Sequence, residues 1–100
     1  MIVRFVEEAQ RELLDAISYY EEARAGLGRR FKDQVDRSVL WIADHPDLYR
    51  LRPAGYRRIN LRVFPYYIPY TVREQTLWVL AVAHGSGKPL YWISRRNKVA

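Results

Sequence analysis

The sequence predicts an α+β domain, with an N-terminal strand and a helical hairpin packed on an antiparallel sheet of about four strands. Two consecutive stretches in the first half have the apolar spacing of helices, and the second half alternates as strands do. Helices followed by a run of strands favour helices on one face of an antiparallel sheet. At 100 residues the chain has room for one core, so we expect a single domain over 1–100.

The helical hairpin is predicted over residues 7–46, after a β-prone first strand at 2–6. Apolar residues recur every three or four positions in two series: Ala9, Leu13, Ala16, Ile17 and Tyr20, then Phe31, Val35, Val39 and Ile42. Gly26 and Gly28 separate the two series, because glycine favours helix ends. Pro46 closes the second helix, since the residue before a proline avoids the α region.

The sheet is predicted as a meander over residues 56–84. In its first strand Ile59, Leu61 and Val63 are expected on one face, with Arg58, Asn60 and Arg62 on the other. The second strand covers 66–72, and residues 73–75 form a turn. Residues 77–84 are apolar on both faces, which predicts a central strand. Pro69 implies a bulge or an outward-facing position, and a basic tail follows at 88–100.

Positive charge is concentrated in the second half of the chain. The net charge is +6, and residues 51–100 carry nine basic side chains against one acid, Glu74. This asymmetry predicts a positive face for a polyanion or an acidic protein, although a solvated basic surface has the same composition. We expect the sheet to gather its arginines on that face: Arg57, Arg58, Arg62, Arg73 and Arg95.

Several classes of protein are excluded by composition. The chain has no cysteine, which rules out disulfides, thiol nucleophiles and cysteine-bound zinc, and fits a reducing cytoplasm. The longest apolar run, 77–83, is too short to cross a bilayer, and the N-terminus does not read as a signal segment. Two histidines and scattered acids show no ligand spacing, so neither a metal nor a cofactor is expected. We predict a cytoplasmic protein with no membrane partner.

Three stretches carry a resemblance to a known family. They are Tyr19-Tyr20-Glu21-Glu22 with the hairpin that follows, Tyr56-Arg57-Arg58-Ile59-Asn60-Leu61 with Phe64-Pro65-Tyr66-Tyr67-Ile68-Pro69-Tyr70, and Val79-Leu80-Ala81-Val82-Ala83-His84-Gly85 with Pro89-Leu90-Tyr91-Trp92 and Arg95-Arg96. In this order they resemble the RelE/ParE toxin superfamily, and the ending is similar to ParE-like and plasmid-stabilisation members. The resemblance implies the toxin of a type II toxin–antitoxin system, which arrests growth until a cognate antitoxin binds it in a hetero-oligomer.

The superfamily implies two different activities. ParE-type members inhibit DNA gyrase and are not known to perform chemistry, whereas RelE-type members cut messenger RNA on the ribosome with clustered basic residues and a C-terminal tyrosine. By position Arg58 and Tyr91 match that set. Asn60, Tyr67 and Gly85 stand where it has basic residues, and they cannot offset phosphate charge. The sequence therefore favours gyrase inhibition, with ribosome-dependent mRNA cleavage as the alternative.

Candidate site residues follow from these alternatives. A ribonuclease would use Arg58, Arg62, His84 and Tyr91, although the sequence favours His84 as a histidine packed at a strand end. The target-binding or basic surface is predicted to comprise Arg57, Arg58, Arg62, Arg73, Lys88, Tyr91, Trp92, Arg95 and Arg96. Within it, Tyr91 and Trp92 are the expected exposed aromatic contacts. Trp41, Trp78 and Trp92 are predicted to be core or interface residues and not base-stacking ones.

Overall fold

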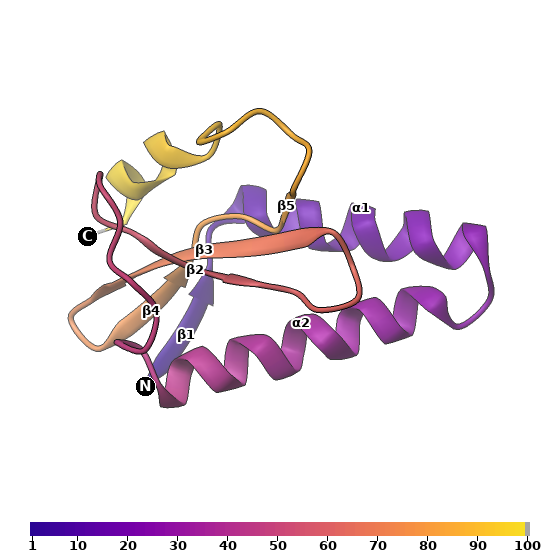
Figure 1. Cartoon of the computed structure of the whole chain (residues 1–100), viewed down its shortest axis with the longest axis horizontal. Coiled ribbons are helices and arrows are strands. Elements are labelled where there is room, and N and C mark those ends of the chain that lie inside the picture. Colours follow the sequence, from indigo (N-terminus) through magenta and orange to yellow (C-terminus); the bar gives the residue numbers. More distant parts are fainter. Residues whose placement is uncertain (100) are drawn as a thin grey trace.

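A computed structural model describes residues 1–99 and confirms the α+β class (Figure 1). In chain order the elements are β1 (Ile2–Phe5), α1 (Glu7–Ala23), α2 (Leu27–Asp44), β2 (Arg57–Asn60), β3 (Tyr66–Arg73), β4 (Thr76–Val79), β5 (Ala83–His84) and the 3-10 helix η1 (Ile93–Lys98). α1 and α2 lie within residues 7–46, and residues 74–75 form the turn between β3 and β4. Among residues 1–99 no helix combines the length and apolar content needed to cross a membrane.

The sheet has the strand order β1-β4-β3-β2, and β5 extends it beside β3. Its pairs are antiparallel as predicted except for β1 and β4, which are parallel, with Ile2 opposite Thr76. A parallel pair needs a long crossover connection, which the helical hairpin and the meander provide here. The central strand is β3, which pairs with β2, β4 and β5.

The prediction of one strand over 77–84 is wrong, because pairing is interrupted between β4 and β5. Leu80 donates its amide to the carbonyl oxygen of Pro69 at 2.9 Å, but Pro69 has no N–H to return to Leu80. The ladder ends there, and the chain resumes pairing with β3 only at Ala83. Pro69 thus marks a ladder break on a buried strand.

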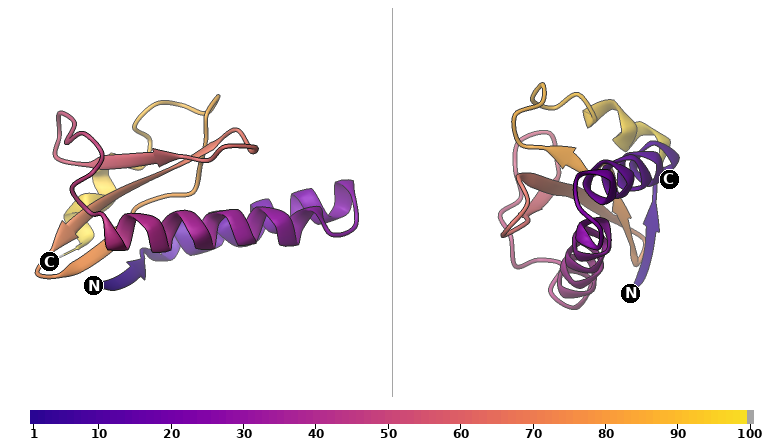
Figure 2. Two further views of the ribbon diagram at one scale, coloured as in Figure 1. Left: turned by 60° about the horizontal axis from the view of Figure 1, so that its bottom comes forward. Right: turned by 90° about the vertical axis from the view of Figure 1, so that its right-hand side faces the viewer.

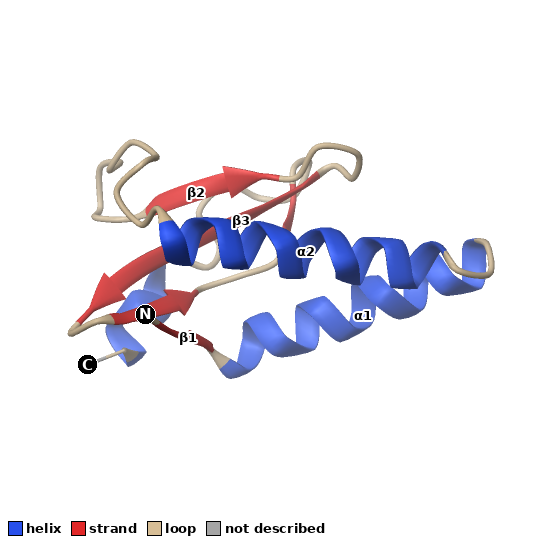
Figure 3. Ribbon diagram, turned by 90° about the horizontal axis from the view of Figure 1, so that it is seen from below, coloured by secondary structure: helices blue, strands red, loops and turns tan. Residues whose placement is uncertain are grey.

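The two faces of the sheet are covered by different elements. Ile59 and Ile68 pair on the face that packs against the helices, and the tail carries η1 across the opposite face (Figures 1 and 3). On that second face Trp92 is fully buried, and its indole N–H donates to the Tyr67 hydroxyl at 2.9 Å. The prediction of Trp92 as an exposed contact is therefore wrong: it anchors the tail to the sheet.

The helical hairpin extends past the edge of the sheet (Figure 2). Its turn is closed by Glu21, whose carboxylate accepts the backbone N–H groups of Gly26 at 2.8 Å and Gly28 at 3.0 Å. A side chain at Gly28 would lie 2.5 Å from the carbonyl oxygen of Ile17, so the close approach of α1 and α2 requires glycine there.

Candidate functional site

A hollow beside β2, on the face that the tail covers, contains two of the four predicted ribonuclease residues, Arg58 and His84. We call it the strand hollow. Its volume is about 370 Å³, and its polar and aromatic lining comprises Arg58, Asn60, Phe64, Tyr66, Tyr67, His84 and Ser86. The Arg58 guanidinium carbon lies 4.0 Å from the Tyr67 ring centroid, and its Nε donates to the Asn60 side-chain oxygen at 3.2 Å. Arg58 is thus held against an aromatic ring by cation–π attraction.

His84 is exposed at the rim of the strand hollow, and the loop after it fixes its protonation pattern. The backbone N–H of Ser86 donates to His84 Nδ1 at 3.1 Å, and the Ser86 hydroxyl lies 2.7 Å from the same nitrogen. An amide N–H can only donate, so Nδ1 carries no proton and the neutral ring is protonated at Nε2. In this tautomer Nε2 is a hydrogen-bond donor, and the lone pair of the ring, on Nδ1, faces Ser86.

Tyr91 belongs to a separate cluster centred on Glu12 of α1, here called the Glu12 cluster. The Tyr91 hydroxyl donates a hydrogen bond to the Glu12 carboxylate at 2.7 Å, and the Val82 backbone N–H donates to it at 3.1 Å. The two terminal nitrogens of Arg95 each donate to one oxygen of the same carboxylate at 3.0 Å. Burial, and then the hydrogen bond to Glu12, raises the pKa of the Tyr91 hydroxyl. This hydroxyl is therefore neutral at physiological pH and committed as a donor.

The arginines do not share one face, so that prediction is wrong. Arg57 and Arg58 are neighbours in β2 and point to opposite sides; Arg57 donates to the Tyr49 carbonyl at 2.8 Å and pairs with Asp47 at 3.6 Å. Arg95 keeps only 13% of its side chain exposed against Glu12. Arg96 lies over Gly55, and its buried Nε has no partner within residues 1–99.

Three further members of the predicted surface lie apart from these. Arg73 ends β3 opposite Thr76, and Lys88 is exposed in the loop after β5. Arg62 was expected beside Arg58, but β2 ends at Asn60 and the chain turns toward Pro65. The Arg62 side chain consequently lies on the helix side of the strand.

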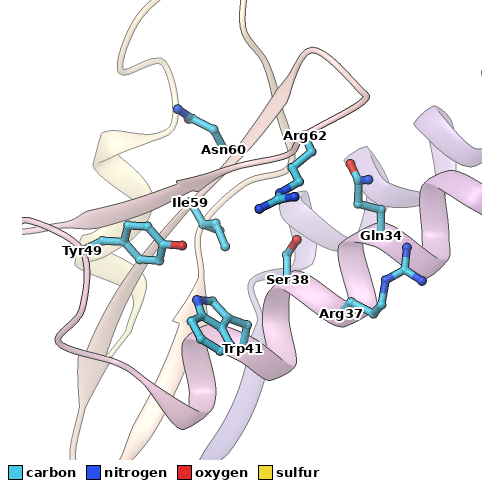
Figure 4. Close-up of a pocket in the computed structure, with 8 residues that line it drawn as sticks. All are labelled: Gln34, Arg37, Ser38, Trp41, Tyr49, Ile59, Asn60 and Arg62. Carbon is cyan, nitrogen blue, oxygen red and sulfur yellow. The ribbon is translucent and has the colours of Figure 1, made fainter.

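Sequence reasoning missed a groove between α2 and β2 (Figure 4), here called the α2–β2 groove. It has a volume of about 460 Å³ and is lined by Gln34, Arg37, Ser38, Trp41, Tyr49, Ile59, Asn60 and Arg62. Trp41 keeps 46% of its surface exposed and stacks on His45, with ring centroids 3.9 Å apart. The available signal was Trp41 itself, which falls outside the apolar series of α2. It was predicted as a core or interface residue, and its exposure excludes the core.

Comparison with known proteins agrees with this geometry. In fold the chain is similar to a toxin–antitoxin structure described as the chromosomal ParDE system of P. aeruginosa, with a TM-score of 0.63, 16% identity, and coverage of 84% of this chain and 95% of that one. It is equally similar to the isolated E. coli RelE toxin, with a TM-score of 0.62, 18% identity and 98% of both chains covered. These likenesses show that the chain shares the fold of these two toxin structures.

Sequence similarity gives the family itself. Residues 3–89 match the model of the ParE toxin of the type II toxin–antitoxin system parDE. The chain is also 33% identical over 79 residues to Toxin ParE2 of two Mycobacterium tuberculosis strains, CDC 1551 / Oshkosh and H37Rv, covering 78% of this chain and 75% of each relative. The chain belongs to the ParE toxin family of type II toxin–antitoxin systems.

Proposed function

We propose that this ParE-family toxin binds DNA gyrase and inhibits it without chemistry of its own, and that a cognate antitoxin neutralises it. The observation that carries the proposal is the engagement of the Tyr91 hydroxyl by Glu12 at 2.7 Å. In the ribonuclease alternative Tyr91 corresponds to the C-terminal tyrosine of RelE-type members. Here its hydroxyl is neutral and already donates its proton to the Glu12 carboxylate. A toxin that acts by binding has no need of that hydroxyl, so this arrangement suits an inhibitor.

Metal-free RNA cleavage needs a base, an acid and cations around one phosphate. The candidate groups are dispersed here. Arg58 stacks on Tyr67 in the strand hollow, and Arg62 lies in the α2–β2 groove on the other side of β2. His84 is at the rim of the strand hollow, with its Nδ1 contacted by Ser86. Asn60 and Tyr67 supply no positive charge to the strand hollow. This dispersal further supports inhibition by binding.

A supercoiling assay tests the proposal. The purified chain, added to gyrase, ATP and relaxed plasmid, is expected to block supercoiling or trap the enzyme on cut DNA. Tyr91→Phe removes the hydroxyl while keeping the ring, and it is expected to leave the inhibition within about twofold of wild type because no proton transfer is involved. Full supercoiling at a large molar excess of folded toxin would reject gyrase as the target.

The ribonuclease alternative keeps one supporting observation, the strand hollow that brings Arg58, Tyr67 and His84 together. Translating ribosomes supplied with a defined message test it directly. Cuts within codons that disappear in Arg58→Ala and His84→Ala would favour this alternative over gyrase inhibition. We expect intact message.

We propose antitoxin binding from three observations: membership of the family, the positive net charge of the chain and the open edge of its sheet. A chain of net charge +6 attracts an acidic partner, and the outer strand β2 has an edge that can accept an added strand. Either proposed target, gyrase or the ribosome, would be met in the cytoplasm, which is where we propose that this toxin acts.

A further inference from the structure

We propose that the α2–β2 groove holds an acidic side chain carried on a short apolar segment of the antitoxin, with Arg62 as the principal anchor. This inference rests on the proposed neutralisation by an antitoxin and specifies where and how that partner is gripped. The groove shares Asn60 with the strand hollow but opens on the helix side of β2, and it shares no residue with the Glu12 cluster.

Hydrogen-bond donors converge on the groove from both of its walls. In Figure 4 the Ser38 hydroxyl and the Trp41 indole nitrogen point up from α2, and the Arg62 guanidinium and the Tyr49 hydroxyl point toward the same space from the opposite side. A carboxylate accepts several such bonds at once, and a guanidinium can hold it through two parallel bonds. The set therefore matches a planar anion better than it matches an amide or a hydroxyl.

Positive charge in the groove is uncompensated. Neither Arg37 nor Arg62 takes part in any of the ion pairs formed within residues 1–99. By contrast Arg57, on the same side of β2, is already paired with Asp47, and Arg95 with Glu12. The groove thus offers the unpaired Arg62 guanidinium to an incoming acid, with Arg37 at its margin.

The groove continues along α2 into a second hollow. That hollow shares Gln34 and Arg37 with the first and adds Arg30, Asp33, Val63 and Phe64. From Arg30 to Trp41 the helix advances about 16 Å at 1.5 Å per residue, which is about three turns of a docked helix. A segment of that length matches peptide recognition in a groove better than it matches an isolated small molecule.

Exposed apolar side chains and one acidic side chain favour a peptide over a nucleic acid as the ligand of the groove. Trp41 is 46% exposed and Val63 66% exposed, and both line the groove and its continuation. An apolar peptide side chain would cover them, whereas a sugar–phosphate backbone would not. Asp33 lines the second hollow, where it would repel a following phosphate but tolerate a peptide that carries a single acid.

Titration with the purified cognate antitoxin tests the inference. Arg62→Ala and Trp41→Ala are each expected to weaken binding by about ten- to a hundredfold, since central arginine and tryptophan contacts dominate interfaces. Arg29→Ala is the matched control, an exposed arginine of α2 outside the groove, and is expected to change the affinity by less than about twofold. Urea midpoints equal to wild type would establish that each variant is folded.

Two further readouts identify the bound group. Replacing the antitoxin's acids one at a time by their amides should reveal one position whose effect disappears in the Arg62→Ala background, the signature of a direct pair. The indole N–H resonance of Trp41 should shift on binding, whereas that of buried Trp92 should not.

The outcomes separate the inference from the proposed function. If wild type binds the antitoxin and the groove variants bind equally well, the inference is overturned and neutralisation stands. If wild type does not bind it at all, neutralisation fails and takes the inference with it. If single-stranded RNA shifts the Trp41 resonance while antitoxin does not, the groove is a nucleic-acid site and the choice of an acidic peptide is wrong.

Discussion

Replacing Glu12 by alanine removes the group that ties α1 to the tail and to the break between β4 and β5. The change removes the acceptor of the hydrogen bonds that Val82, Tyr91 and Arg95 donate. The Arg95 side chain, which is only 13% exposed, then keeps one protein acceptor, the Leu80 carbonyl oxygen at 3.0 Å. Breaking a buried pair costs about 3–5 kcal/mol. Because the Glu12 side chain is 23% exposed and Arg95 keeps one acceptor, we expect a loss of about 2–3 kcal/mol.

Glu7→Ala is the control, because it makes the same chemical change in the same helix. Glu7 pairs with Arg11 at i,i+4, both side chains are at least two-thirds exposed, and such pairs contribute about 0.3–0.5 kcal/mol. At about 4–8 °C per kcal/mol for a domain of this size, Glu12→Ala should lower Tm by about 10–20 °C and Glu7→Ala by only a few degrees.

Hydrogen exchange adds a local readout to the thermal measurement. The Val82 amide should lose protection in Glu12→Ala beyond what the global destabilisation explains, because its acceptor is gone. Equal Tm values for the two variants, with Val82 still protected, would show that the Glu12 cluster does not hold the tail.

Three other perturbations test the packing. Gly28→Ala should lower the free energy of unfolding, measured in urea, by about 1–2 kcal/mol, since the clash with the Ile17 carbonyl oxygen outweighs the gain in helix propensity. An unchanged urea midpoint would mean that α1 and α2 can move apart to accept the methyl group. Burial raises the pKa of the Tyr70 hydroxyl to about 12, so the folded state holds that proton more tightly than the unfolded chain does. The free energy of unfolding should therefore fall as pH rises from about 10 to 12, and it should fall less steeply in Tyr70→Phe. Identical pH slopes for the two proteins would contradict this. Gln75→Gly should stabilise by about 0.5–1 kcal/mol, because Glu74 and Gln75 have φ of 50° and 65° in the turn after β3; a lower Tm would count against it.

The regular elements were predictable because their signals are local. The apolar spacing of Phe31, Val35 and Val39 determines which face of α2 is buried, and alternation around Ile59 does the same for β2. The interruption between β4 and β5 was not predicted, because it depends on Pro69 in another strand. The information was present in Pro69, but its effect requires knowing that Leu80 lies opposite.

The site was harder to predict because its contacts are distant in sequence. Tyr91 and Arg95 meet Glu12 across about eighty residues, and nothing near the tail indicates an acidic partner there. The prediction for Trp92 failed for the same reason: its place in the C-terminal tail suggested exposure, whereas its position is determined by the contact with Tyr67. The position of Arg62 depends on where β2 ends, and strand ends are the least certain part of a pattern.

Expression in cells that lack the antitoxin is the most direct measurement of what this toxin does. DNA breaks and messenger ends are mapped together within minutes of induction, for wild type and for Tyr91→Phe. We expect breaks at gyrase sites and an SOS response while messages stay whole, in both proteins alike. Messages severed inside codons on ribosomes, with chromosomal DNA uncut and the effect lost in Tyr91→Phe, would contradict inhibition by binding.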